Sequence, residues 1–251
     1  MININIDGQE LKAKEGQTIL EVARENGIDI PTLCYHENLA PYGACRLCSV
    51  EIFMGGRSRI VASCLYPVEE GLEVKTNSPR IIDNRKMLME LLLARCAQNE
   101  VIKKLASEMG VEQASFKSEY LENNDCILCG LCVRTCEQIV EASAISQVSR
   151  GVKKEVATPF FEPSLACIGC GSCAYVCPTQ VIDIIQTPTH RIIWDRTFEM
   201  LTCAECGAAN ITKAQRDWMV KLFNQPADYY DLCDTCKRKK VSSVQKVLAK
   251  F

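Results

Sequence analysis

The chain of 251 residues is 47% hydrophobic and 24% charged, a composition that supports a buried core and excludes a disordered chain. Its 29 basic and 31 acidic residues give a formal charge of −2, which argues against a general nucleic-acid binder because such a surface must neutralise phosphates. The count of 17 cysteines is unusually high for a chain of this length. In a reducing cytosol these thiols stay free to bind metal.

The N-terminal residues carry no targeting pattern. MININIDGQELKAKEG holds Asp7 and Glu10, whereas a secretory signal needs a basic start followed by an apolar stretch. The longest apolar run, near residues 87–94, is interrupted by Glu90 and is far shorter than the roughly 20 residues needed to cross a bilayer. We therefore expect a cytoplasmic protein without a membrane span.

Residues 1–78 are predicted to form a β-grasp domain of two hairpins and one helix. The expected strands are residues 2–6, 10–14, 49–53, 60–62 and 72–76, with turns at Asp7-Gly8 and Gly55-Gly56. Thr18 and Glu21 form a capping-box pattern, which predicts a helix that ends at Gly27.

The rest of the chain divides into three further segments. Residues 79–120 are expected to form a helical linker, because apolar residues recur at helical spacing after Pro79 and again over residues 98–109. Residues 121–190 combine cysteines and glycines with short apolar strands, and residues 191–251 contain two cysteine pairs around a helix from Thr212 to Phe223. The fold class is therefore predicted as α+β.

Two cysteine runs in the third segment have the C-x2-C-x2-C-x3-C spacing of bacterial ferredoxins. CILCGLCVRTC contains Cys126, Cys129, Cys132 and Cys136, and CIGCGSCAYVCP contains Cys167, Cys170, Cys173 and Cys177. In such paired runs the fourth cysteine ligates the other cluster. The spacing thus predicts a ferredoxin-like domain with two 4Fe-4S clusters, for which two zinc sites are the alternative. The expected ligands are Cys126, Cys129, Cys132 and Cys177 for the first cluster and Cys136, Cys167, Cys170 and Cys173 for the second.

A third set of cysteines lies within the predicted β-grasp domain. Cys34, Cys45, Cys48 and Cys64 are separated by ten, two and fifteen residues. This pattern indicates a 2Fe-2S cluster, although plant-type ferredoxins have a first gap of four residues.

These motifs carry a family resemblance that covers about residues 1–190. PTLCYHE, YGACRLCSVEI and the following Cys64 resemble the N-terminal domain shared by the large iron-sulfur subunit of respiratory complex I and the [FeFe]-hydrogenases. They are also similar to the small diaphorase subunit of NAD-linked nickel-iron hydrogenases and to NAD-dependent formate dehydrogenases. The resemblance continues through RKMLMELLLAR and both ferredoxin runs.

The sequence departs from this family after the RKMLMELLLAR helix. Much of the family carries there one histidine and three cysteines that bind a further 4Fe-4S cluster. Residues 96–125 contain only Cys96 and no histidine. We expect that cluster to be absent and Cys96 to be a buried helix thiol.

The C-terminal cysteines Cys203, Cys206, Cys233 and Cys236 form two C-x2-C pairs. Four thiolates on two such knuckles can close a tetrahedral structural zinc site, so the segment is predicted to be zinc-ribbon-like. The same ligands suit a further iron-sulfur cluster, and this alternative stays open.

No residue is predicted to be catalytic. The sequence has no glycine-rich nucleotide-binding motif, and no nucleophile or acid-base pair stands out. Three redox clusters without a substrate site indicate an electron-transfer subunit. The resemblance implies three partners, namely a flavin- and NAD(P)-binding diaphorase subunit, a small thioredoxin-like 2Fe-2S subunit and a hydrogenase catalytic module. In an electron-bifurcating version, ferredoxin is a further partner.

Other functions stay open at this point. The chain could be the equivalent subunit of a formate dehydrogenase or other NAD(P)-linked complex, or a free-standing ferredoxin-like carrier. A different class is an iron-sulfur or zinc regulator that senses redox state or binds nucleic acid through the zinc-ribbon-like segment and residues 237–240. A sensor is expected to hold one labile cluster rather than three. Three bound clusters lower the charge by about 6, and we expect basic residues such as Arg46 and Arg134 to offset it at partner interfaces.

Overall fold

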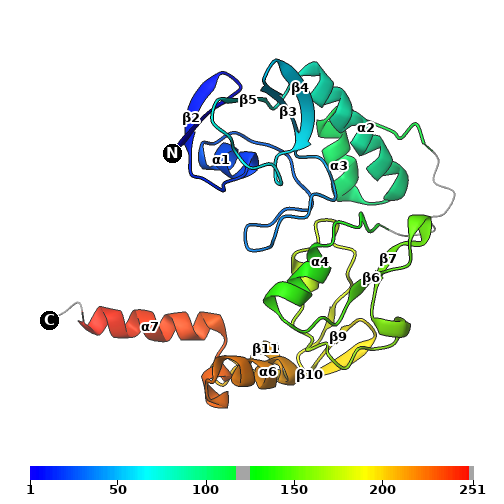
Figure 1. Ribbon diagram of the computed structural model, residues 1–251. Helices are drawn as coiled ribbons and strands as arrows, with labels where there is room; N and C mark the ends of the chain where they lie inside the picture. Colours follow the sequence, from blue (N-terminus) through cyan, green and yellow to red (C-terminus); the bar gives the residue numbers. More distant parts are fainter. Residues whose placement is uncertain (117–124, 249–251) are drawn as a thin grey trace. The chain divides into compact units, whose positions relative to one another are not determined.

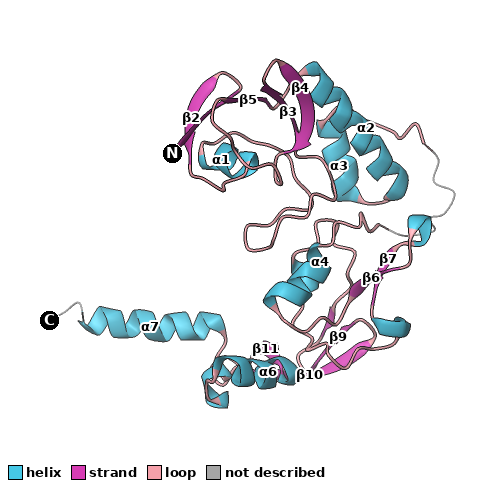
Figure 2. Ribbon diagram, in the orientation of Figure 1, coloured by secondary structure: helices cyan, strands magenta, loops and turns pink. Residues whose placement is uncertain are grey.

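The computed structural model describes residues 1–116 and 125–248, except for the side chains of residues 243–248. The chain divides into two compact units that alternate along the sequence, and each contains helices and strands (Figures 1 and 2). Unit 1 comprises residues 1–134, 148–155 and 177–181, and unit 2 comprises residues 135–147, 156–176 and 182–251. The predicted boundary between residues 120 and 121 lies outside the described residues.

Unit 1 contains a five-stranded sheet with the order β2-β1-β5-β3-β4. Its strands are β1 (Ile2–Ile6), β2 (Gln9–Ala13), β3 (Ser49–Met54), β4 (Arg57–Ala62) and β5 (Leu72–Lys75). β1 and β5 are parallel, whereas all other neighbours in this sheet are antiparallel. Both predicted hairpins are confirmed, and both turns have positive φ angles, at Asp7-Gly8 and at Gly55-Gly56.

Helix α1 (Ile19–Glu25) packs on this sheet. The predicted capping box is confirmed, because the Thr18 hydroxyl accepts from the Glu21 backbone N–H and the Glu21 carboxylate accepts from the Thr18 backbone N–H. The chain leaves the helix through Gly27, whose φ is +73°. The fully buried residues of this core include Ile6, Ile19, Leu20, Val22, Val50, Leu72 and Val74.

Helices α2 (Pro79–Arg95) and α3 (Glu100–Glu108) form a second core in unit 1 and confirm the predicted helices of the linker. Ser78 caps α2 and Asn99 caps α3, each through its side chain. The buried residues of this core are Leu33, Leu47, Met89, Leu93, Cys96, Ile102, Ala106 and Val111. Cys96 is fully buried, as predicted.

Short elements follow where the chain alternates between the units. They are α4 (Leu131–Arg134), the π-helix η1 (Thr135–Ile139), β6 (Ser146–Val148), η2 (Gly151–Lys153), β7 (Glu155–Ala157), η3 (Pro159–Phe161) and α5 (Ser172–Tyr175). Strands β6 and β7 pair with each other.

The C-terminal part of unit 2 is built on a four-stranded antiparallel sheet with the order β11-β10-β9-β8. Its elements are β8 (Ile185–Gln186), β9 (His190–Ile193), β10 (Arg196–Thr202), β11 (Ala209–Thr212), α6 (Lys213–Phe223), η4 (Ala227–Tyr230) and α7 (Asp234–Leu248). The helix predicted after Thr212 is confirmed as α6. None of the described helices has the length and apolar character needed to cross a bilayer.

Candidate cluster and metal sites

The first site is formed by four cysteines in unit 1. Cys34, Cys48 and Cys64 are buried and Cys45 is half-buried. Their sulfurs form two pairs, because Cys34 shares a hydrogen bond with Cys45 and the Sγ atoms of Cys48 and Cys64 are 3.3 Å apart. Two pairs of adjacent thiols match the two irons of a 2Fe-2S cluster, so the donor set fits this group.

Hydrogen bonds within the pairs also lower the pKa of one thiol in each pair. The bond from Cys34 lowers the pKa of Cys45 to about 6, and the bond from Cys64 lowers the pKa of Cys48 to about 7. The pKa values of Cys34 and Cys64 are raised by the same bonds. Since the thiolate is the form that binds metal, each pair offers one ligand that is ionised near neutral pH.

A buried arginine that the sequence analysis missed holds the loop of this site. Arg85 in α2 is 7% exposed, and it donates from Nε to the carbonyl of Leu47 at 3.1 Å and from Nη2 to the carbonyl of Ser49 at 3.0 Å. These two carbonyls flank Cys48. Burial lowers the pKa of Arg85, and the nearby Cys48 opposes that shift. The guanidinium thus fixes the backbone on both sides of Cys48 and places a positive charge near its thiol.

Arg134 is buried in unit 1 at 7% exposure, and the expectation that it lies at a partner interface is wrong. Its Nη1 donates to the carbonyl of Ala40 and its Nη2 to the carbonyl of Cys34 at 2.8 Å, while the guanidinium lies 5.3 Å from the centre of the Tyr42 ring. Its charge also favours the ionised form of Cys129. The arginine is buried because it supplies hydrogen-bond donors to these two carbonyls, and buried carbonyls need such partners.

The second site in unit 1 comprises Cys126, Cys129, Cys132 and Cys177. Burial is the main cause that raises the pKa of Cys129 to about 11, and the nearby thiols of Cys177 and Cys126 contribute to the same shift. Burial is also the main cause that raises the pKa of Cys126, whose Sγ accepts from the Leu128 backbone N–H at 3.4 Å. Four thiols with backbone donors in a buried setting fit a 4Fe-4S cluster.

Cys177 reaches this site through a segment that is anchored on α3. Asn99, which caps α3 with its side-chain oxygen, donates from Nδ2 to the carbonyl of Thr179 at 2.8 Å. One side chain therefore serves both the helix end and the segment that carries the distant cysteine. Sequence analysis did not identify the contact with Thr179, because the two residues are 80 positions apart.

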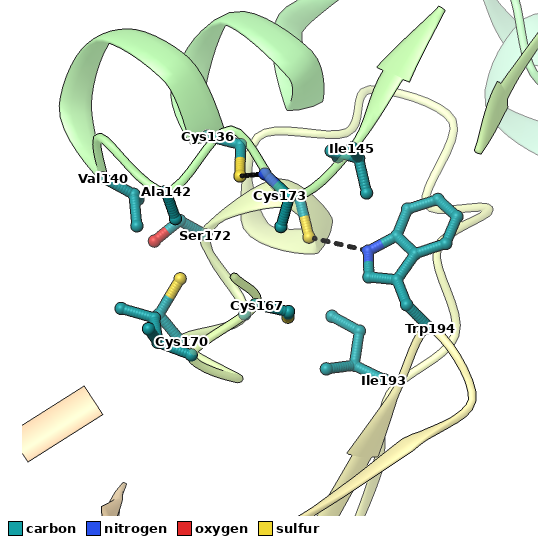
Figure 3. Close-up of a pocket in the computed structure, with 13 residues that line it drawn as sticks. Cys136, Val140, Ala142, Ile145, Cys167, Cys170, Ser172, Cys173, Ile193 and Trp194 are labelled. Atoms are coloured by element: carbon teal, nitrogen blue, oxygen red, sulfur yellow. Dashed lines mark hydrogen bonds between the residues drawn. The ribbon is translucent and has the colours of Figure 1, made fainter. Parts of the chain in front are cut away.

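The third site is a pocket in unit 2 (Figure 3). Cys136, Cys167, Cys170 and Cys173 line it together with apolar residues that include Val140, Ile145 and Ile193. The Sγ of Cys136 accepts from the Ala144 backbone N–H at 3.3 Å, and the Sγ of Cys173 accepts from the indole N–H of Trp194 at 3.5 Å (Figure 3). Four thiols, an apolar wall and N–H donors to sulfur again fit a 4Fe-4S cluster. Cys136 and Cys177 each belong to the unit that contains the other run.

The sheet of unit 2 binds the backbone of the loop that carries these cysteines. Three side chains from β9, β10 and the end of β11 donate to its carbonyls. Arg191 bonds to Gly169 at 2.8 Å and Cys170 at 3.2 Å, Arg196 to Ser164 at 2.7 Å and Cys167 at 2.8 Å, and Thr212 to Ile168 at 2.6 Å. The C-terminal segment thus contacts the loop of the third site through these three side chains.

Gly169 shows how tightly this loop is held. Its φ is +67°, and a Cβ at this position would lie 2.7 Å from the ring of Phe198 in β10. A side chain is therefore excluded by the backbone conformation and by the neighbour together.

The fourth site comprises Cys203, Cys206, Cys233 and Cys236, whose sulfurs all lie within 4.8 Å of one another. The sulfurs of Cys206 and Cys233 are 3.8 Å apart. A tetrahedral zinc ion with Zn–S bonds of about 2.3 Å requires S–S edges of about 3.8 Å. A bond from the Cys233 backbone N–H to the Cys203 sulfur, at 3.3 Å, is the main cause that lowers the pKa of Cys203 to about 6. This set fits a single metal ion.

Comparison with known families matches two parts of the chain. Residues 1–79 match the family described as 2Fe-2S iron-sulfur cluster binding domain, and residues 125–181 match the family described as 4Fe-4S dicluster domain. The first match includes all four cysteines of the first site, and the second includes both ferredoxin runs.

Curated relatives are subunits of several oxidoreductases. The G-type subunit of an NADH-quinone oxidoreductase from Rhizobium meliloti is 32% identical over 82% of this chain and 27% of its own length. NADP-reducing hydrogenase subunit HndD of Solidesulfovibrio fructosivorans is 34% identical over 78% of this chain and 37% of its own length. The gamma subunit of the NAD-reducing hydrogenase HoxS of Cupriavidus necator is 33% identical over 62% of this chain and 74% of its own length.

A chain of known structure has a similar fold. A chain in the crystal structure of an NAD+-reducing [NiFe]-hydrogenase in its hydrogen-reduced state aligns with a TM-score of 0.56 and 30% identity, over 62% of this chain and 74% of that chain. The chain spans only 27% and 37% of the first two relatives, but it covers 74% of the HoxS gamma subunit. The chain therefore belongs to the family of iron-sulfur subunits that includes the gamma subunit of NAD-reducing hydrogenase and the G-type subunit of NADH-quinone oxidoreductase.

Proposed function

We propose that this chain is a non-catalytic electron-transfer subunit of an NAD(P)-linked hydrogenase complex. It relays electrons between a flavin- and NAD(P)-binding diaphorase subunit and a hydrogenase catalytic module. The observation that carries the proposal is the grouping of twelve cysteines into three sets of four, each with a donor arrangement that fits an iron-sulfur cluster. When bound, such clusters take up and release single electrons.

The proposed ligands follow these sets. Cys34, Cys45, Cys48 and Cys64 bind the 2Fe-2S cluster in a β-grasp domain; Cys126, Cys129, Cys132 and Cys177 bind the first 4Fe-4S cluster; Cys136, Cys167, Cys170 and Cys173 bind the second. The electrostatic proximity of Cys177 to Cys126 and Cys129 supports the exchange of the fourth ligand, and so does the presence of Cys136 in the pocket with the second run.

Zinc is the metal proposed for Cys203, Cys206, Cys233 and Cys236, in a zinc-ribbon-like segment. The separation of 3.8 Å between two sulfurs and the limit of 4.8 Å on all of them support one ion over a cluster. A cluster has several metal atoms, each with its own cysteine ligand or pair of ligands, so it holds these sulfurs farther apart. The role of this zinc is structural.

The partners are proposed from the relatives. The names of three of them contain NAD-reducing hydrogenase, NADP-reducing hydrogenase and NADPH-Fe(3+) oxidoreductase. We infer that a diaphorase subunit, a small thioredoxin-like 2Fe-2S subunit and a catalytic subunit assemble with this chain. We propose a cytoplasmic location, because a reducing compartment keeps cysteines available as metal ligands.

Along the sequence, the proposed organisation keeps four segments. These are the β-grasp domain (1–78), the helical linker without the His/Cys cluster (79–120), the two-cluster domain (121–190) and the zinc-ribbon-like segment (191–251). The bonds from Arg191, Arg196 and Thr212 to the second ferredoxin run support a refinement, in which the fourth segment stabilises the third.

Metal analysis of the anaerobically purified full chain tests the cofactors. We expect about ten iron atoms, about ten inorganic sulfides and about one zinc per chain, with EPR signals of one 2Fe-2S and two 4Fe-4S clusters after reduction. Twelve to fourteen iron atoms without zinc would make the C-terminal cysteines a fourth redox site. Four iron atoms or fewer in carefully protected protein would overturn the electron-transfer function.

Affinity purification of the tagged chain from its own cells tests the partners. The expected result is recovery with a flavoprotein and a hydrogenase subunit, and hydrogen-dependent reduction of NAD(P) by the purified complex. Recovery with a formate dehydrogenase subunit would reassign the catalytic module. Recovery with nucleic acid, or of the chain alone, would contradict the proposal.

A further inference from the structure

The turn between β9 and β10 has an unusual backbone. Ile193 pairs with Arg196, so Trp194 and Asp195 form a two-residue hairpin turn, and their φ angles are +52° and +57°. Such turns favour Asn-Gly because both residues need positive φ. A tryptophan in this conformation is strained, and strained residues persist where other contacts hold them.

The contact that holds Trp194 is with the third site. Its indole lines the pocket beside Ile193, and Nε1–H points at the Sγ of Cys173 at 3.5 Å (Figure 3). Cys173 is 9% exposed, so water has little access to this sulfur. An indole N–H in this position stabilises negative charge on the sulfur.

The rest of the hairpin keeps the indole in place. Arg191 in β9 and Arg196 in β10 bind carbonyls on both sides of the cysteine loop. Phe198 packs against Gly169 of the same loop. The turn therefore cannot move away from Cys173 without breaking these contacts.

We propose that Trp194 is a positioning residue that raises the reduction potential of the second 4Fe-4S cluster, by donating its indole N–H to the sulfur of Cys173. The inference rests on the proposed function, since it requires a cluster at this site. Reduction adds a negative charge that spreads over the cluster and its ligand sulfurs, and a hydrogen-bond donor stabilises that charge. The hairpin thus tunes the second cluster as well as supporting its loop.

The test is the substitution Trp194→Phe in the full chain, with the three cluster potentials measured by EPR-monitored redox titration. Phenylalanine keeps an aromatic side chain at the pocket but removes the N–H donor. We expect a lower potential for the second 4Fe-4S cluster and unchanged potentials for the other two clusters. Unchanged potentials for all three clusters, with full iron content, would overturn the inference.

The chain offers a matched control, because it contains only one other tryptophan. Trp218 in α6 packs edge-on against Phe223, with ring centres 6.2 Å apart. Trp218→Phe should leave all three potentials unchanged. An equal fall in both variants would show a general effect of tryptophan loss and would also overturn the inference.

If the Trp194→Phe variant does not retain the second 4Fe-4S cluster, a spectroscopic measurement still tests the contact between Trp194 and that cluster. In the Trp218→Phe variant, Trp194 is the single tryptophan, and it can be labelled with 15N in the indole ring. We expect pulsed EPR of the reduced protein to show 15N coupling to the second 4Fe-4S cluster. Absence of this coupling, with the cluster present, would refute the contact. Absence of a second 4Fe-4S signal from the unaltered protein would instead contradict the proposed function.

Discussion

The 2Fe-2S region of unit 1 and the C-terminal segment of unit 2 hold cysteines in different ways. In unit 1 the cysteine loop is fixed to two apolar cores, and Leu47, between Cys45 and Cys48, is fully buried. In the C-terminal segment α6 has no buried residue, and the strands reach their neighbour through arginine and threonine side chains. On the proposed zinc assignment, the metal ion supplies folding free energy that so small a core does not. The comparison shows that two groups of four cysteines can be held in place by different means, one by apolar packing and the other by polar contacts and, as proposed, by the metal ion itself.

The largest effect is expected from loss of a proposed zinc ligand, which should unfold the C-terminal segment and leave the 2Fe-2S region intact. Cys203→Ala removes one of four proposed zinc ligands, and structural zinc contributes roughly 10–16 kcal/mol of apparent binding free energy at neutral pH. We expect loss of zinc and rapid proteolysis after about residue 190, while the 2Fe-2S EPR signal persists. Cys96→Ala is the matched control and should retain zinc and iron. Zinc retained by Cys203→Ala would show that the ion is held elsewhere.

The second prediction concerns the apolar support of the 2Fe-2S loop. Leu47→Ala should destabilise unit 1 by about 2–5 kcal/mol, because it leaves a cavity in the core beneath the cysteines. The measurement is the urea concentration at which the 2Fe-2S absorption is half lost. Leu91→Ala on α2, whose side chain is 48% exposed, should have little effect. Equal effects of the two substitutions would mean that this core does not hold the loop.

The third prediction concerns the polar support in unit 2. Arg196→Met leaves the carbonyls of Ser164 and Cys167 without this donor, at an expected cost of about 1–3 kcal/mol. The second 4Fe-4S cluster should therefore be lost at lower urea concentration than the 2Fe-2S cluster. Arg216 forms an ion pair with its exposed neighbour Asp217, and Arg216→Met should change stability by less than about 1 kcal/mol. If both variants lost the second 4Fe-4S cluster at the same urea concentration as the unaltered protein, the hydrogen bonds from Arg196 would not stabilise this site.

The smallest effect is expected at the cap of α1. Thr18→Ala removes the capping hydroxyl and should cost about 1 kcal/mol. Thr18→Ser keeps the hydroxyl and should recover most of that loss. The readout is again the urea midpoint of the 2Fe-2S absorption. If serine and alanine are equally destabilising, the methyl group rather than the cap is what matters.

Local patterns predicted much of unit 1, because they depend on neighbouring residues. Thr18 and Glu21 identified the start of α1, and the glycine turns identified both hairpins. The helices after Pro79 followed from the spacing of apolar residues. The four cysteine sets were also proposed from sequence, since metal chemistry restricts the spacing of ligands.

Contacts over long sequence separations were not predictable in this way. The burial of Arg85 depends on carbonyls 36 and 38 residues away, and that of Arg134 on a carbonyl 100 residues away. Trp194-Asp195 contains neither glycine nor asparagine, so no turn signal marked the residues that contact Cys173. The link between the C-terminal sheet and the second ferredoxin run was therefore missed.

The alternation of the chain between the two units has a consequence for its synthesis. On the proposed ligand assignment, the first 4Fe-4S site lacks a ligand until Cys177 is translated, 45 residues after Cys132. At about 5–20 residues per second the nascent chain carries an incomplete site for roughly two to nine seconds. During that interval its thiols are exposed to oxidation and to wrong metals. The first ferredoxin run therefore cannot receive its cluster as it leaves the ribosome, whereas the second site, whose Cys136 is made before the rest, has all its ligands once Cys173 is translated.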